Sequence, residues 1–229
     1  VPHHSNADQF LMNFDAFFSR KYDRLVEVYS SWGRADDVSS DMNLNNDKFP
    51  QLEITRFMRK YRFGLIASSD GHDGNPGNAS LCGGHRYFLG HPNGSGRAVV
   101  LADGLSRNSV FDALKQRRCY ATTGTPMGLF FSVNGHELGS VIEGGSETGP
   151  AELKLVVKAV DNITRIELIK NGNIHLTLRD IESLGLETEI EDPEFDSSED
   201  SYYYVKVFQE DGEMAWSSPV YFVGEKTRR

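Results

Sequence analysis

The fold is decided by the stretch Phe63-Gly64-Leu65-Ile66-Ala67-Ser68-Ser69-Asp70-Gly71-His72-Asp73-Gly74-Asn75-Pro76-Gly77. Its first five residues form an apolar run with the length and composition of a buried strand. The polar residues that follow place a carboxylate and an imidazole at the carboxyl end of that strand, where ligands gather in α/β folds. Asp70 and His72 point the same way along an extended backbone, so they are suited to half of a divalent-metal site. The alternative is a surface turn, because Asp-Gly and Asn-Pro-Gly are also turn sequences.

Two further segments carry ligand-type residues on predicted strands. His3 and His4 follow what reads as the tail of a strand; one of them could face a site, or both could be structural histidines. Glu27 is a charge inside an apolar strand, and it is either a metal ligand, a partner that orients an imidazole, or an edge residue facing water. Together with Asp70 and His72, these residues place ligand-capable groups on three successive strands, which favours a site.

The first part of the chain alternates strand and helix. Apolar residues recur at helical spacing in two segments, and a third, short helix has Ser106 or Asn108 available as its N-cap. Strand, helix, strand, helix, strand is the order of a parallel α/β fold. The predicted helices cover residues 8–21, 50–60 and 108–117, the predicted strands 25–29, 63–67 and 99–102, and the predicted loops 33–48 and 71–97.

From Met127 onward the pattern changes to short strands at near-regular spacing. Asn134-Gly135 and Asn171-Gly172 are hairpin turn dipeptides. The acidic segment 191–201 is predicted to be an exposed loop. These features are typical of a β-sandwich-like module, with strands over 129–133, 153–160, 165–170, 202–208 and 219–223. We therefore divide the chain into residues 1–126, an α/β part, and residues 127–229, a small all-β part.

Composition excludes some functions. The formal net charge of −9 argues against a nucleic-acid binder that works by neutralising phosphates. No apolar run approaches the length of a membrane span, so we expect no membrane insertion. Cys82 and Cys119 are too few for a disulfide scaffold; two free thiols are favoured over one bridge.

Several other polar residues have an ordinary explanation beside a functional one. His85 and His91 either cover a site as part of a lid or are solvated loop residues. Arg117 and Arg118 either bind an anion or simply complement a helix C-terminus, and the second reading is favoured. His136 and His175 follow predicted hairpin turns and receive no role.

Five segments, in this order, resemble the carboxyl-terminal half of a PHP-superfamily metallohydrolase, of the CehA/McbA-like and DUF3604-type subgroup. They are Pro2-His3-His4-Ser5, Val26-Glu27-Val28-Tyr29-Ser30, Ser68-Ser69-Asp70-Gly71-His72, Ala113-Leu114-Lys115-Gln116-Arg117-Arg118-Cys119-Tyr120-Ala121-Thr122-Thr123-Gly124 and Trp216-Ser217-Ser218-Pro219.

The resemblance implies a distorted (βα)7 barrel, similar to a TIM barrel, that holds divalent ions (Zn, Mn or Fe) at the carboxyl ends of its strands. By position, His3 corresponds to the histidine of a mid-barrel motif and Glu27 to an acidic strand residue, while Asp70 and His72 correspond to the final Asp-x-His. Enzymes similar to this one hydrolyse phosphoesters, or carbamate and amide bonds, with a metal-activated water.

The sequence therefore predicts a metal-dependent hydrolase of a small-molecule substrate. The expected metal ligands are His3, His4, Glu27, Asp70 and His72, and Glu27, Asp70 and His72 are the expected catalytic residues. We expect the family's opening His-x-His to lie outside these 229 residues, in a preceding segment or another chain, so that this part alone could be inactive. Exposed strand edges of half a barrel would favour pairing with a second copy. The alternative is a non-catalytic binding module that recognises a carbohydrate or a protein.

Overall fold

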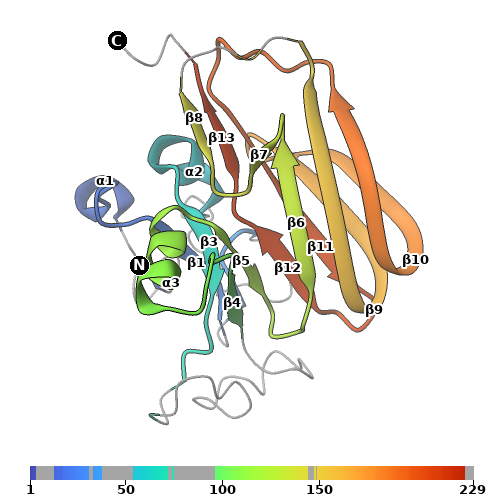
Figure 1. Cartoon of the computed structure of the whole chain (residues 1–229), viewed down its shortest axis with the longest axis horizontal. Coiled ribbons are helices and arrows are strands. Elements are labelled where there is room, and N and C mark those ends of the chain that lie inside the picture. Colours follow the sequence, from blue (N-terminus) through green and yellow to red (C-terminus); the bar gives the residue numbers. More distant parts are fainter. Residues whose placement is uncertain are drawn as a thin grey trace.

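The structure is a computed structural model in which β-strands dominate. It describes residues 1–3, 13–30, 33–37, 54–71, 74, 96–143, 147 and 149–224. Of these residues, 52% lie in strands and 12% in helices. The described strands form one three-stranded and one ten-stranded sheet. The helices lie at one side of the molecule and a long two-stranded ribbon lies at the other (Figure 1).

The small sheet has the order β2-β1-β3. Strands β1 and β3 run parallel, with Leu25 opposite Gly64, and β2 pairs antiparallel with β1. The short helix α2 precedes β3, so this one strand–helix–strand unit matches the order predicted from the sequence. The elements are α1 (Phe14–Phe17), β1 (Leu25–Ser30), β2 (Gly33–Arg34), α2 (Thr55–Tyr61) and β3 (Gly64–Ala67).

The large sheet is mainly antiparallel and includes strands from both parts of the chain. Its main path is β4-β5-β12-β11-β9-β6-β7, with β10 on β9, and β13 between β11 and β8. The β13–β8 pair is parallel. The elements are β4 (Arg97–Val100), α3 (Arg107–Lys115), β5 (Cys119–Thr122), β6 (Gly128–Val133), β7 (His136–Glu137), β8 (Val141–Glu143), β9 (Ala151–Lys170), β10 (Asn173–Asp192), β11 (Ser201–Gln209), β12 (Met214–Ser217) and β13 (Val220–Val223).

The expected α/β fold with a partial (βα)7 barrel, followed by a small β-sandwich, is wrong. A barrel needs successive parallel strands, whereas β5 pairs antiparallel with both β4 and β12, and one curled antiparallel sheet replaces the sandwich. Helix α3 therefore connects two antiparallel neighbours instead of crossing between parallel ones. Short apolar runs separated by helices do not specify the direction in which strands pair, and here β5 pairs antiparallel on both sides, with β4 and with the distant β12. The division at residue 126 stays a prediction.

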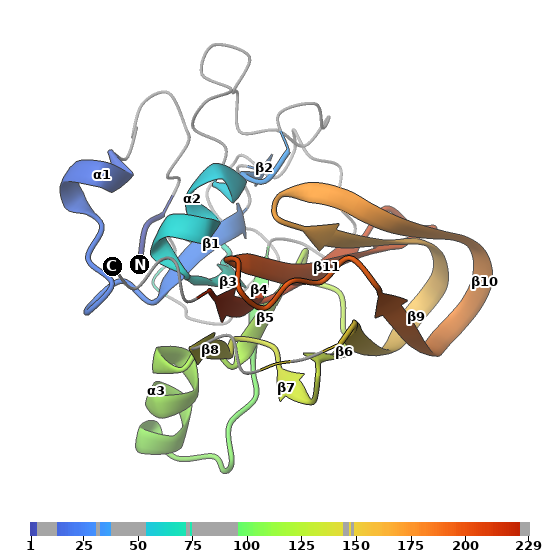
Figure 2. The ribbon, with the colours of Figure 1, turned by 90° about the horizontal axis from the view of Figure 1, so that it is seen from above.

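Strands β9 and β10 form a curled ribbon. Each has 20 residues, and the two pair antiparallel with register shifts between Arg179 and Ser183 and between Ser183 and Gly185. The first half of β9 also pairs with β6 and its second half with β11, so the strand bends between two neighbours. Among the described strands, β10 pairs with β9 alone. Figure 2 shows the ribbon curling at the side of the molecule opposite α1 and α3.

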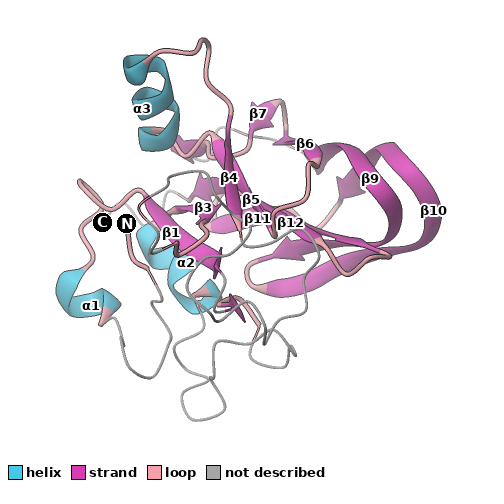
Figure 3. Cartoon of the chain, turned by 90° about the horizontal axis from the view of Figure 1, so that it is seen from below, coloured by secondary structure: helices cyan, strands magenta, loops and turns pink. Residues whose placement is uncertain are grey.

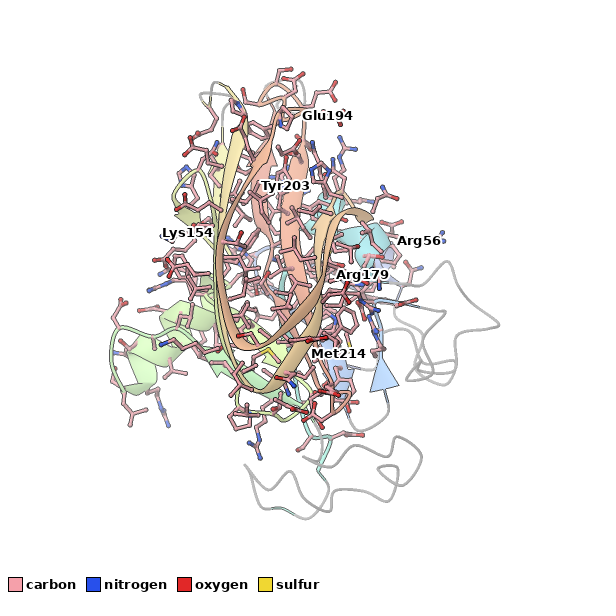
Figure 4. The ribbon with its side chains drawn as sticks, turned by 90° about the vertical axis from the view of Figure 1, so that its right-hand side faces the viewer. Arg56, Lys154, Arg179, Glu194, Tyr203 and Met214 are labelled. Atoms are coloured by element: carbon pink, nitrogen blue, oxygen red, sulfur yellow. The ribbon has the colours of Figure 1, made fainter. Side chains whose placement is uncertain are left out.

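Two apolar cores lie on opposite faces of the large sheet. Alternate residues of β11 contribute to each: Tyr203 and Val205 to the core under the curled ribbon, and Tyr202 and Tyr204 to the core shared with the small sheet. Figure 4 looks onto the ribbon, whose strands cross the sheet face that carries Tyr203. Residues of α1 and α2 belong to the second core, whereas α3 contributes no residue to it and lies apart from those two helices (Figure 3). This alternation is the period-two pattern of a strand buried on both faces.

A buried charged network joins the two sheets. The Asp36 carboxylate accepts hydrogen bonds from Arg34 (2.8 and 2.9 Å) and from Trp216 Nε1 (3.0 Å), and it lies 2.7 Å from Lys206 Nζ. The Arg34 guanidinium also lies over the Trp216 ring, 5.5 Å from its centroid. Burial alone would raise the pKa of Asp36, but the charges of Arg34 and Lys206 outweigh burial and hold the pKa well below its ordinary value.

Local turn and cap chemistry follows the sequence prediction. Asn134 and Gly135 both have positive φ, as a two-residue hairpin requires, and so do Asn171 and Gly172; they connect β6 to β7 and β9 to β10. Ser106 caps α3 through its side chain, which accepts from the Ser109 amide.

The predicted helix over 8–21 is described only from residue 13 onward, where the chain is helical over Phe14–Phe17 and extended at Phe18. None of the described helices is long and apolar enough to cross a membrane.

Candidate metal-binding site

Three segments meet beside the parallel pair β1 and β3. The amino-terminal residues lie along β1, where the Glu27 amide donates to the Pro2 carbonyl at 3.1 Å. Beyond its last residue, Ala67, strand β3 continues into Ser68, Ser69 and Asp70. Because β1 and β3 run parallel, the segment that follows β3 lies on the same side of the sheet as the Glu27 side chain and His3. This segment brings Asp70 to His3.

A histidine lies between two carboxylates at this point. His3 Nδ1 is 2.8 Å from Glu27 Oε2, and His3 Nε2 is 3.2 Å from Asp70 Oδ1. The Ser68 hydroxyl donates a hydrogen bond to the same Glu27 oxygen. The Glu27 side chain is 4% exposed and that of Asp70 10%, whereas the His3 ring is half-buried. In the row Glu27–His3–Asp70, the two carboxylates are therefore buried and the His3 ring is the part that solvent can reach.

The electrostatics favour a positive charge in this row. The hydrogen bond to Glu27 raises the pKa of His3 above its ordinary value, burial opposes this effect, and Asp70 adds to it. Asp70 also has φ +52°, a left-handed backbone conformation that non-glycine residues adopt at a cost. Two carboxylates that face one imidazole form an environment suited to a cation.

The donor set fits part of a divalent-metal site. Two ligands of one ion, each about 2.0–2.2 Å from it, lie roughly 3 Å apart, which is close to the separation of His3 Nε2 and Asp70 Oδ1. Glu27 binds the other ring nitrogen, which is the position of a carboxylate that orients a metal-bound imidazole. Within the described part of the chain, no group of three or more His, Cys, Asp or Glu side chains is arranged to hold a metal ion. The described residues thus supply two donors and one orienting group.

The predicted site residues separate into two groups. The structure brings His3, Glu27 and Asp70 together, although they are distant in sequence; their role as ligands stays a prediction. His4 and His72 lie outside the described residues, as do His85, His91 and Cys82. Cys119 is a buried free thiol whose pKa burial raises to about 11, so it is not a reactive thiolate.

Sequence reasoning missed Ser68 as a partner of Glu27. The signal was its place at the end of β3, because residues that follow a buried strand of a parallel pair gather with those of its neighbour. His136 and His175, which received no role, each lie beside a carboxylate: Glu147 at 3.2 Å and Asp192 at 3.6 Å.

Comparisons with known proteins give a family likeness and no activity. A family model described as "Protein of unknown function (DUF3604)" matches residues 85–140. The expected likeness to DUF3604-type proteins is confirmed over this segment, whereas the PHP superfamily stays a prediction.

Three curated relatives are each named only as an uncharacterized protein. Those of Chlamydia trachomatis serovar D and Chlamydia muridarum are 26% and 25% identical over 241 residues, and that of Chlamydia pneumoniae is 25% identical over 246 residues. Each match covers 96% of this chain but only 37–38% of the relative, so the chain spans little more than a third of their length. No solved structure matches the chain.

Proposed function

We propose that this chain carries part of the active centre of a metal-dependent hydrolase that cleaves phosphoester, carbamate or amide bonds. The observation that supports it is the row Glu27–His3–Asp70, in which two distant segments place a nitrogen and an oxygen donor 3.2 Å apart. Both ring nitrogens of His3 face a carboxylate: Glu27 can orient the imidazole through Nδ1, while Nε2 lies beside the second donor, Asp70.

Each residue has a distinct task in the proposed centre. Glu27 accepts a hydrogen bond from Nδ1–H of His3, which leaves the lone pair of Nε2 on the side of Asp70. Asp70 provides a hard oxygen beside that nitrogen, and Ser68 holds Glu27 in place. His72 is the predicted third donor. A divalent cation bound here would supply Lewis acidity for polarising the scissile bond and activating water.

The proposal concerns only the portion of the centre that these residues form. The curated relatives are longer than this chain, and their names give no activity. The substrate class rests on the resemblance stated from the sequence, and the metal is Zn, Mn or Fe by the chemistry of a mixed nitrogen and oxygen donor set.

Metal titration of the purified, chelator-treated chain tests the proposal. We expect the wild-type chain to bind Zn²⁺, Mn²⁺ or Fe²⁺ in calorimetry, and both Asp70→Ala and His3→Ala to lose that binding. Glu27→Gln keeps the size of the side chain but removes its charge, so the metal affinity should fall about 10–100-fold. Hydrolysis of p-nitrophenyl phosphate by the metal-loaded chain measures activity in the same series.

Two variants outside the row are the matched controls. Asp103→Ala removes a carboxylate that is 78% exposed and paired with Arg118, and His175→Ala removes a histidine beside Asp192. Both should bind metal like the wild type. Equal metal binding by wild type, Asp70→Ala and His3→Ala, or no binding of any of the three metals, would contradict the proposal.

A further inference from the structure

A cavity of about 590 Å³ opens between the end of α3 and the β7–β8 segment. Its walls are residues 112 and 115–118 on one side and 136–142 on the other, with Arg24 completing it just before β1. Figure 2 shows α3 beside β7 and β8. The cavity shares no residue with the row Glu27–His3–Asp70.

Positive charge predominates in this cavity although the chain carries a net charge of −9. Two carboxylates also line it, Asp112 and Glu137, but in the described structure neither forms an ion pair with a lining arginine. Of the lining arginines, only Arg118 has an ion-pair partner within the described part of the chain, Asp103 at 3.0 Å. The lining cations are Arg24, Lys115, Arg117 and Arg118.

Arg117 is held in the cavity wall by a specific backbone arrangement. It is 9% exposed and has a left-handed backbone, φ +63°. Its Nε donates to the Gly139 carbonyl at 2.9 Å. Gly139 approaches so closely that a Cβ atom there would lie 2.3 Å from the Arg117 carbonyl oxygen. Within the described residues no carboxylate pairs with this guanidinium, and burying such a charge unpaired is costly.

Arg24 supplies a second, incompletely bonded guanidinium. Its Nε is buried and has no hydrogen-bond partner among the described residues, an exception to the rule that buried polar groups are bonded. Burial lowers the pKa of Arg117, and the charge of Arg24 lowers it further. Two guanidinium groups that repel each other, one of them with an unused donor, form an arrangement that an anion would complete.

The geometry points to an oxyanion site: we infer that this cavity binds a phosphate group, held by Arg24 and Arg117. Phosphate fits better than a monoanion because a dianion balances both guanidinium charges, and because arginine binds phosphate oxygens through two parallel hydrogen bonds. The phosphate could be free or part of a small organic molecule. Either source presents the same terminal oxygens to the two arginines.

Calorimetric titration with inorganic phosphate tests the inference. The chain is kept metal-free with chelator, at about pH 8, where phosphate is mainly dianionic, and at constant ionic strength. We expect saturable binding of phosphate and weaker binding of acetate. Arg24→Gln and Arg117→Gln should each weaken phosphate binding about 10–100-fold, the range for losing a charge-assisted hydrogen bond.

Arg107→Gln is the matched control because Arg107 is exposed on α3 and does not line the cavity. It should bind phosphate like the wild type. Arg117→Lys keeps the charge but loses the planar fork, so it should bind weakly; it also carries the test if Arg117→Gln does not fold, as judged by circular dichroism. Titration with phenyl phosphate distinguishes the two sources of phosphate. If the natural ligand is an organic phosphate, phenyl phosphate should bind more tightly than inorganic phosphate. If it is free phosphate, inorganic phosphate should bind at least as tightly as phenyl phosphate.

Three outcomes would overturn the inference: no saturable phosphate binding, equal binding of acetate and phosphate, or the same loss in Arg107→Gln as in Arg24→Gln. The hydrolase proposal is tested separately, since Asp70→Ala should lose metal binding and keep phosphate binding.

Discussion

Replacing Asp36 with alanine is expected to lower the free energy of unfolding by about 3–5 kcal/mol, the usual cost of removing one partner from a buried ion pair. The variant leaves the guanidinium of Arg34 and the ammonium of Lys206 inside the molecule without their common carboxylate. It also removes the acceptor of Trp216 Nε1. Urea unfolding followed by circular dichroism measures the change.

An exposed ion pair provides the control for Asp36→Ala. Glu187, 67% exposed, lies 3.3 Å from Lys154, and Glu187→Ala should cost no more than about 1 kcal/mol because water screens such pairs. A loss of similar size in both variants would contradict the idea that burial gives the Asp36 network its effect.

The same network makes stability depend on pH. The pKa of Asp36 is lower in the folded chain than its ordinary value of about 3.9. Its contribution to stability is therefore complete above that value, and it is lost as the pH falls toward the folded pKa. Asp36→Asn should lose less stability than the wild type between about pH 5 and pH 3. Equal losses would show that other carboxylates, such as Asp192, dominate acid unfolding.

Replacing Gly139 with alanine is expected to cost about 2–5 kcal/mol, the sum of a left-handed backbone penalty and an overpacking penalty. Gly139 has φ +87°, and its added Cβ would lie 2.3 Å from a backbone oxygen of Arg117, which cannot move aside as a side chain can. Thermal and urea unfolding measure the loss. Phosphate titration of the same variant reports whether Arg117 has moved.

Gly135 separates the two contributions. It also has positive φ, +76°, but nothing lies within 4 Å of its added Cβ. Gly135→Ala should therefore cost only the backbone penalty of about 1–2 kcal/mol. If the two alanine variants are equally stable, the close approach of Gly139 to Arg117 has no energetic weight.

The sequence predicts those features that depend on local chemistry. Asn-Gly pairs turn the chain at residues 134–135 and 171–172, because both residues must adopt positive φ in a two-residue hairpin. Ser106 caps a helix because its side chain satisfies an amide of the first turn. For Glu27 the sequence leaves open a metal ligand, a partner of an imidazole or an edge residue facing water, and the structure places it buried beside His3.

Pairing between distant strands is the part that could not be predicted. Strand β5 pairs with β12, more than 90 positions later, and no local pattern encodes that pairing. Strand β10 was missed although Ile174, Leu176 and Leu178 alternate with polar residues. Charges elsewhere in the segment weaken that signal, and the position of the strand is set by its pairing with β9 along most of its length. The sequence favours a helix-end charge pair for Arg117 and Arg118, because Arg24 and Gly139, which line the same cavity, come from distant segments.

The outer side of β10 has a consequence for how copies of this chain behave in solution. A long edge strand with unpaired amide and carbonyl groups is a template for aggregation, and proteins commonly protect such strands with charged side chains. In β10 this protection comes from a series of exposed carboxylates, on Asp180, Glu182, Glu187, Glu189 and Glu191. Replacing these carboxylates with neutral amides would remove the mutual repulsion, so it should favour self-assembly of the chain.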